Sequence, residues 1–165
     1  MSEFTIKSYQ NSRLEDNQMI SLVFKVYVEG GFTPLETAQK NFTPTELKKR
    51  GDIFLASDSN EIIQGIVICA YPDNPYRQVA NTEEAEMHIL AVHPSNRSRG
   101  LGKLLCLAFE TKAKSLSFSH LVLSTQAIML NAHSLYESLG YKRNPARNWK
   151  KNGKSYLVYE KSLET

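Results

Sequence analysis

Two glycines and three cationic residues stand close together in the segment Arg97-Ser98-Arg99-Gly100-Leu101-Gly102-Lys103. Glycine lets a backbone approach a ligand closely, and the first N–H groups of a helix have no partner within that helix. A helix that begins in this segment would present those N–H groups and the positive end of its dipole to an anion. Arg97, Arg99 and Lys103 would add positive charge around it. The segment therefore predicts a phosphate-binding loop.

Two common phosphate loops do not match this segment. A P-loop begins with glycine and places Ser or Thr directly after its Gly-Lys pair, but those positions hold Arg97 and Leu104. The dinucleotide fingerprint requires a third glycine, where the chain has Leu105. The remaining alternative to a binding loop is a plain glycine-containing turn between a strand and a helix, with arginines on its surface.

The elements around the loop follow from hydrophobic periodicity. A strand over 85–92 is stopped by Pro94, and a helix begins at Gly100 and runs to about Ser117. Its apolar face would consist of Leu101, Leu104, Leu105, Ala108 and Phe109. Further along the chain we expect a strand over 120–125 and a helix from about Met129 to Leu139, with Gly140 as its left-handed cap. Two closing strands are expected over 141–143 and 156–160.

The first half of the chain reads as a strand, three helices and a hairpin. Residues 4–9 alternate as a strand does, and Ser12 to Glu15 form a capping box for a helix that Gly30-Gly31 ends. The segments 33–36 and 43–46 each place Pro at the first helical position. Residues 52–57 and 61–71 read as a hairpin, and 72–84 as a loop. This order predicts one α/β domain over 1–165, with a mixed sheet and helices on both faces.

Composition narrows the function classes. The chain is 41% hydrophobic and 22% charged with a net charge of +3, which is ordinary globular composition without the dense basic patch of nucleic-acid-binding proteins. Cys69 and Cys106 lie in apolar runs outside any metal-ligand spacing, and the four histidines form no ligand motif. No run is long enough to span a membrane, and the N-terminus lacks signal-peptide features. We expect a cytoplasmic protein without metal, membrane or nucleic-acid partners.

Three segments at matching spacing resemble the GNAT superfamily of N-acetyltransferases. Arg97-x-x-Gly100-x-Gly102 resembles its pyrophosphate-binding signature, Leu90-Ala91-Val92 the strand before it, and residues 135–141 its second motif. The resemblance extends from about Ala85 to Arg143. It implies the acyl-CoA N-acyltransferase fold with splayed central strands, acetyl-CoA as co-substrate, and direct transfer of acetyl to a primary amine in a ternary complex. The cofactor-binding residues it implies are Leu90, Ala91, Val92, Arg97, Ser98, Arg99, Gly100, Leu101, Gly102 and Lys103.

The resemblance also assigns catalytic roles. Strand alternation places Glu86, His88, Leu90 and Val92 on one face, with Met87, Ile89 and Ala91 on the other. Glu86 would then be the general base that deprotonates the amine, with His88 or a water molecule as alternatives. Tyr136 corresponds to the tyrosine that protonates the departing thiolate of CoA.

The acceptor side is less defined by the sequence. The resemblance places it at the first helices, where Tyr27 and Phe32 are the candidate substrate-binding residues for a small-molecule or peptide amine. Met129 stands where the family often has Asn, so no direct cofactor contact is expected of Asn131. Homodimers are common in the family. The alternative function is a non-catalytic acyl-CoA-binding regulatory module, and a basic nucleic-acid-binding domain is a more remote one.

Overall fold

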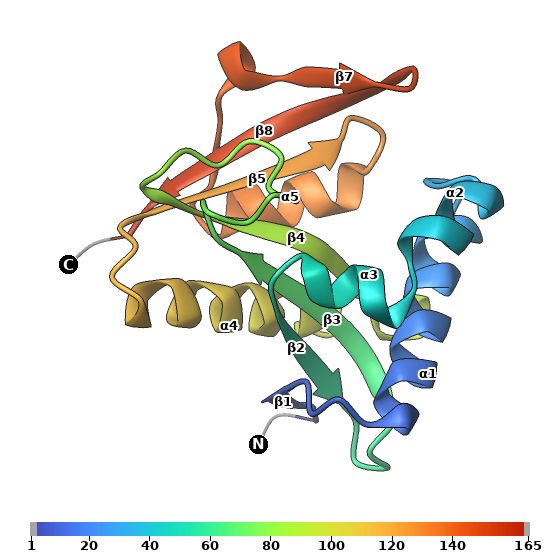
Figure 1. Ribbon diagram of the computed structural model, residues 1–165. Coiled ribbons are helices and arrows are strands. Elements are labelled where there is room, and N and C mark those ends of the chain that lie inside the picture. Colours follow the sequence, from blue (N-terminus) through green and yellow to red (C-terminus); the bar gives the residue numbers. More distant parts are fainter. Residues whose placement is uncertain (1–2, 164–165) are drawn as a thin grey trace.

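A computed structural model describes residues 3–163 of the chain. Its centre is an eight-stranded mixed sheet with the order β1-β2-β3-β4-β5-β8-β6, in which β7 also pairs with β8 (Figure 1). Among the strand pairs within residues 3–163, only β4–β5 is parallel. The strands are β1 Thr5–Ser8, β2 Asp52–Ser57, β3 Ile63–Ala70, β4 Glu84–Val92, β5 His120–Gln126, β6 Lys142–Arg143, β7 Trp149–Lys151 and β8 Lys154–Ser162.

Helices cover both faces of this sheet, which confirms the predicted fold class (Figure 1). The α1–α3 side carries α1 Arg13–Val23, its π-helical continuation η1 Phe24–Val28, α2 Leu35–Asn41 and α3 Pro44–Lys49. The opposite side carries α4 Leu101–Ser115 and α5 Leu130–Ser138. Short 3₁₀ turns occupy Pro94–Asn96 and Pro145–Arg147.

Local signals explain where the helices begin. Ser12 and Glu15 form the predicted capping box at the start of α1, and Thr43 caps α3 by accepting the Glu46 N–H at 3.1 Å. The expectation for the segment 33–36 is wrong in detail, because α2 begins at Leu35 and Pro34 is its cap residue rather than its first helical residue.

A large apolar core lies on each face of the sheet, between the strands and the helices. Leu101, Leu105 and Phe109 of α4 pack with Tyr136 of α5 on one face of the sheet. Met19, Leu22 and Val23 of α1 pack with Phe42 and Leu47 on the other. Full burial of one such side chain stabilises the fold by roughly 1.5–3 kcal/mol. These contacts therefore hold both helical layers against the sheet.

The central strands diverge halfway along their length. Cα pairing between β4 and β5 runs from Glu84–His120 to Met87–Leu123 and then ends. β5 continues to Gln126, paired with β8 on its other side. Beyond Met87, the edge of β4 that faces β5 therefore has no strand partner, and the predicted splay is confirmed.

A bulge in β4 corrects the predicted side-chain alternation. Val67 pairs with Leu90 and Ile68 with His88, so Ile89 is an extra residue in the strand, and its φ is +44°. An extra residue reverses the alternation beyond it. The single face predicted for Glu86, His88, Leu90 and Val92 is therefore wrong.

The residues before and after the bulge therefore have their side chains on opposite faces of β4. Leu90 and Val92 pack against the core on the α4 side. Glu86 and His88 point the other way, because Ile68, the partner of His88, packs in the core on the α1–α3 side.

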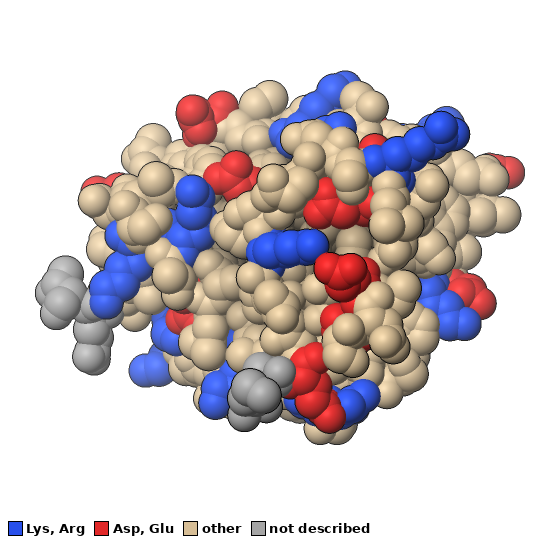
Figure 2. Space-filling view, turned by 90° about the horizontal axis from the view of Figure 1, so that it is seen from below, with Lys and Arg blue, Asp and Glu red and all other residues tan. Residues whose placement is uncertain are grey.

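Charged side chains of both signs are interspersed on the face seen from below (Figure 2). That face shows no continuous basic surface. In the part of the chain that the structure describes, no helix is both long and apolar enough to cross a membrane.

Candidate active site

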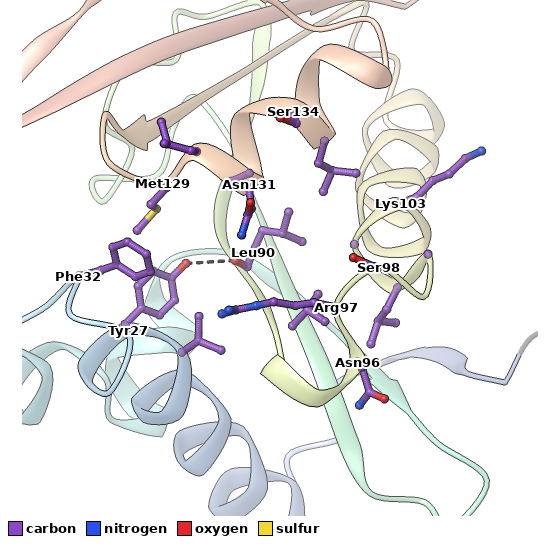
Figure 3. A pocket seen from close by; sticks show the side chains of 18 of the residues that line it. Tyr27, Phe32, Leu90, Asn96, Arg97, Ser98, Lys103, Met129, Asn131 and Ser134 are labelled. Carbon is purple, nitrogen blue, oxygen red and sulfur yellow. Dashed lines mark hydrogen bonds between the residues drawn. The ribbon is translucent and has the colours of Figure 1, made fainter.

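The splay between β4 and β5 opens into a pocket of about 750 Å³ (Figure 3). This volume lies within the range of small-molecule and cofactor sites. The pocket is built by η1 and the loop after it, the end of β4, the start of α4 and the first turns of α5. Its lining residues are Val26, Tyr27, Phe32, Leu90, Val92, Asn96, Arg97, Ser98, Gly100, Leu101, Gly102, Lys103, Ile128, Met129, Leu130, Asn131, Ala132, Ser134 and Leu135.

The N-terminus of α4 is uncapped and opens into this pocket. Gly100 is the cap residue, with φ +82° and no side-chain capping bond. The first intrahelical hydrogen bond runs from the Leu104 N–H to the Gly100 carbonyl at 3.1 Å. The N–H groups of Leu101, Gly102 and Lys103 precede that bond and have no acceptor within the helix. Free N–H groups at a helix start that lines a cavity form an anion site.

The two glycines at the start of α4 have different structural roles. A Cβ at Gly100 would meet no atom within 4 Å, so this glycine is required by its left-handed backbone rather than by space. A Cβ at Gly102 would come within 2.9 Å of Leu135 Cδ2. Gly102 therefore allows α4 and α5 to approach each other at the pocket.

The arginines of the loop point in different directions. Arg97 extends across the pocket towards Tyr27, whereas the side chain of Lys103, a lining residue on α4, is directed away from Arg97 (Figure 3). Arg99 does not line the pocket. Its guanidinium donates to Asn96 Oδ1 at 2.7 Å and forms an ion pair with Glu3. The expected contact of the Arg99 side chain with a cofactor is therefore not supported by its position.

Most of the other predicted cofactor residues line the pocket. They are Leu90, Val92, Ser98, Gly100, Leu101 and Gly102. Ala91 does not, because it is 1% exposed and its side chain packs in the core on the α1–α3 side. The bulge explains this position, since it reverses the side to which each residue after Ile89 points.

Tyr27 and Phe32 lie on the wall across from α4 (Figure 3). The Tyr27 hydroxyl donates to the Leu90 carbonyl at 3.2 Å. Burial raises the pKa of Tyr27 to about 12, so this phenol stays a donor at neutral pH. A carbonyl has two lone pairs, which leaves Leu90 able to accept a second bond from a ligand.

Tyr136 is one layer behind the pocket. Its neighbours Ser134 and Leu135 line the pocket, whereas the Tyr136 ring is buried and packs against Tyr141 and Tyr159 with centroids 6.0 and 5.7 Å away. Burial raises its pKa well above the ordinary value. Within residues 3–163 its hydroxyl has no hydrogen-bond partner. Tyr136 is therefore a neutral phenol whose proton is not engaged by the protein.

Glu86 is enclosed on the α1–α3 face of β4. It is fully buried, and its carboxylate accepts the backbone N–H groups of Gln78, Val79 and Ala80 at 3.0–3.3 Å. His88 Nε2 lies 3.1 Å from Glu86 Oε1. Burial raises the pKa of the Glu86 carboxyl, but the bond with His88 and the N–H donors outweigh it and hold the pKa below its usual range. Neither Glu86 nor His88 lines the pocket.

We expect Glu86→Gln to destabilise the fold by about 1–3 kcal/mol, because an amide nitrogen would face three N–H donors that now have an acceptor. The folded pKa is lowered, so the ionised carboxylate stabilises the protein above its unfolded pKa of about 4.3, and this contribution is lost as the pH falls. Urea unfolding from pH 7 to pH 3 measures both effects. The variant should lose less stability on acidification than the parent.

The matched control is Glu83→Gln, an exposed acid in the loop directly before β4, which should leave the stability within about 0.5 kcal/mol. If the Glu86→Gln protein and its parent were equally stable at pH 7, the bonds from the backbone N–H groups to the Glu86 carboxylate would not contribute to stability as proposed.

The α5 side of the pocket was not predicted from the sequence. Met129 and Asn131 both line it, so the departure from the family pattern at Met129 does not remove an amide from the pocket. The Thr125 hydroxyl lies 3.7 Å from Met129 Sδ. The Thr-x-x-x-Met spacing of these two residues is the sequence signal for this contact.

Cys69 and Cys106 are fully buried and free. Burial raises the pKa of both thiols to about 12, so neither is a nucleophile at neutral pH. Among the described residues, no three His, Cys, Asp or Glu side chains are grouped as metal ligands.

Comparison with known proteins gives consistent matches. Residues 17–141 match the family model of the acetyltransferase (GNAT) family. The chain is 28% identical over 107 residues to N-acetyltransferase 8 of Homo sapiens, an alignment that covers 65% of this chain and 46% of that protein. It therefore spans less than half the length of this curated relative.

Solved structures share the fold. An acetyltransferase from Streptococcus agalactiae superposes with a TM-score of 0.77 at 20% identity, over 99% of this chain and 100% of that one. A GNAT family acetyltransferase from Elizabethkingia anophelis with acetyl-CoA bound superposes with a TM-score of 0.67 at 18% identity, over 99% and 100%.

Proposed function

The chain belongs to the acetyltransferase (GNAT) family, and we propose that it transfers the acetyl group of acetyl-CoA directly to a primary amine while both are bound. The observation that carries this proposal is the uncapped N-terminus of α4, which opens into the pocket at the splay between β4 and β5. A structure that shares the fold has acetyl-CoA bound.

The residues of the pocket fit the parts of acetyl-CoA. The N–H groups of Leu101, Gly102 and Lys103, with the side chains of Arg97 and Lys103, would hold the pyrophosphate. The edge of β4 beyond Met87 has backbone groups without a strand partner, and these would bind the extended pantetheine arm. Bound acetyl-CoA supplies the thioester, and an N–H of this free edge would stabilise negative charge on its carbonyl oxygen.

Tyr136 is the proposed general acid. The amine nitrogen forms a bond with the thioester carbon, the C–S bond breaks, and the sulfur leaves with the electron pair. A neutral phenol beside the leaving sulfur can donate its proton to that thiolate. Two observations support Tyr136 in this role: its raised pKa, and its hydroxyl without a partner in residues 3–163.

Glu86 and His88 together are the proposed route for the proton that the amine loses. Glu86 has its oxygens occupied by N–H donors, so we propose that it positions the His88 ring. His88 Nδ1 is buried and has no hydrogen-bond partner in the described chain. The pair lies on the α1–α3 side, where η1 brings Tyr27 to the pocket, and a water molecule would connect it to the acceptor.

The test is release of CoA thiol from acetyl-CoA with a panel of primary amines, with the acetylated product identified by mass spectrometry. The proposal predicts amine-dependent thiol release and one acetyl group added per thiol. Binding of acetyl-CoA without turnover of any amine would favour the alternative, a non-catalytic acyl-CoA-binding module.

A further inference from the structure

The side of the pocket that faces away from the phosphate loop is lined by apolar side chains. This acceptor-side wall comes from η1, from the loop after it and from the segment 128–130 at the start of α5, and it consists of Val26, Tyr27, Phe32, Ile128, Met129 and Leu130 (Figure 3). Ile128 and Leu130 are 64% and 68% exposed although both are large apolar residues. Exposed apolar side chains grouped at a pocket are typical of a site that binds an apolar ligand.

The loop that carries Phe32 is fixed at both ends of this wall. The Phe32 N–H donates to the Tyr27 carbonyl at 2.8 Å, which holds the loop against η1. The Phe32 carbonyl accepts a bond from Gln126 Nε2 at 3.1 Å and another from Lys154 Nζ. Gln126 is the last residue of β5, shortly before the segment 128–130. These bonds therefore join the two parts of the wall across the splay in the sheet.

Two cations lie at the acceptor-side wall. Lys154 is bonded to the Phe32 carbonyl, and Arg97 extends across the pocket towards Tyr27 (Figure 3). Among residues 3–163, no Asp or Glu lines the pocket. An ammonium group held against this wall would lose its hydration without a carboxylate to pair with. An acceptor that carries further positive charge is therefore poorly matched to the wall.

The acids at the start of β4 are engaged with other groups. Both carboxylate oxygens of Glu84 accept bonds from the Arg147 guanidinium at 2.9 Å, and Glu86 accepts the backbone N–H groups of residues 78–80. Both side chains are buried. Turning either one into the pocket would break these bonds, so β4 supplies no counter-ion for a cationic acceptor.

We propose that the acceptor is a primary amine on an uncharged apolar group, an alkyl or aryl chain that packs against the acceptor-side wall. This inference rests on the proposed acetyl transfer. The amine would lie at the thioester, and the apolar group would extend towards Ile128 and Leu130. Burial of apolar surface on both partners favours such a complex. The one positive charge of this acceptor disappears with the proton that the amine loses before it attacks.

The experiment compares n-hexylamine with hexamethylenediamine, which has the same alkyl chain and a second ammonium group at its far end. Thiol release at saturating acetyl-CoA gives kcat and KM for each amine. The parent should have a kcat/KM at least about ten-fold higher for n-hexylamine, mainly through KM, because the diamine would place an unpaired charge on the wall. From n-butylamine to n-hexylamine, each added methylene should raise kcat/KM about two- to four-fold.

Ile128→Glu should reverse this preference. The new carboxylate would pair with the far ammonium of the diamine and remove apolar surface from the site of the hexyl chain, so kcat/KM should rise for the diamine and fall for n-hexylamine. Because Ile128 is exposed, the melting temperature should stay near that of the parent. Ile62→Glu is the matched control, since Ile62 is an exposed isoleucine in the turn between β2 and β3, and it should keep the parent's preference.

Two results would overturn the inference. One is a parent protein that acetylates the diamine as well as n-hexylamine or better. The other is an Ile128→Glu protein that keeps both the melting temperature and the amine preference of the parent. A protein that acetylates no primary amine of any class, although acetyl-CoA raises its melting temperature, would instead overturn the proposed transfer itself.

Discussion

Arg97→Gln is expected to weaken acetyl-CoA binding about 10- to 100-fold, because a charge-assisted hydrogen bond contributes roughly 1.5–3 kcal/mol. The Arg97 side chain extends across the pocket towards Tyr27 (Figure 3), and the free N–H groups at the start of α4 open into the same pocket. A neutral amide there leaves the pyrophosphate with the helix N-terminus and Lys103. Isothermal titration with acetyl-CoA measures the change directly.

Arg99→Gln provides the matched control, two positions along the same loop. Its guanidinium is held outside the pocket by Asn96 and Glu3, so its dissociation constant for acetyl-CoA should stay within about two-fold of the parent's. Equal losses in the two variants would show that the loop acts only through its net charge. A larger loss for Arg99→Gln would contradict the direction assigned to both side chains.

Tyr136→Phe is expected to lower kcat by about 10²–10⁴, the usual contribution of a positioned general acid. The change removes one oxygen from a ring whose packing against Tyr141 and Tyr159 it leaves intact. Affinity for acetyl-CoA should be unchanged, since Tyr136 does not line the pocket. Steady-state kinetics together with the binding constant measure both effects.

Tyr141→Phe is the control for this second prediction. The Tyr141 hydroxyl is buried without a hydrogen-bond partner in the described part of the chain, so its loss should change neither kcat nor stability by much. A Tyr136→Phe enzyme with the parent's kcat would remove Tyr136 as the acid. Tyr27, whose neutral hydroxyl reaches the pocket, would then be the next residue to test.

Local sequence determines the phosphate loop, and it was predictable for that reason. Gly100, Gly102 and the start of α4 are adjacent in the chain, and their geometry follows from backbone conformation and helix ends. The direction of each arginine was not predictable, because it depends on partners far away in the sequence. Glu3 draws Arg99 out of the pocket, and nothing in the spacing of the loop indicates this.

The bulge in β4 is the main feature that the alternation of side chains along a strand does not predict. A strand period of two predicts one face for Glu86 and Leu90, but register is set by the pairing with β3. The extra residue Ile89 reverses the pattern halfway along. Because of this bulge, Glu86 and His88 lie on the opposite face of β4 from the cofactor residues Leu90 and Val92. The separation of the proposed proton route from the cofactor side therefore depends on one extra residue, which the hydrophobic pattern of the strand does not reveal.

The closing hairpin was also only partly predicted. Trp149 lies in β7, where its ring stacks on Tyr156 with centroids 4.1 Å apart and its Nε1 donates to Ser124 Oγ at 2.9 Å. A strand of three residues is too short to show a period, so the sequence does not indicate a strand at Trp149. Partners from β5 and β8 hold it in place.

The melting temperature with and without excess acetyl-CoA tests the central claim most directly, with free CoA and adenosine diphosphate as controls. Ligand at a hundred times its dissociation constant should stabilise the fold by about 2.7 kcal/mol. For a chain of this size that corresponds to a rise of roughly 5–10 °C. We predict such a rise with the parent and a smaller one with Arg97→Gln at the same concentration. No rise at millimolar acetyl-CoA would contradict the cofactor site, and with it the roles proposed for Tyr136, Glu86 and His88.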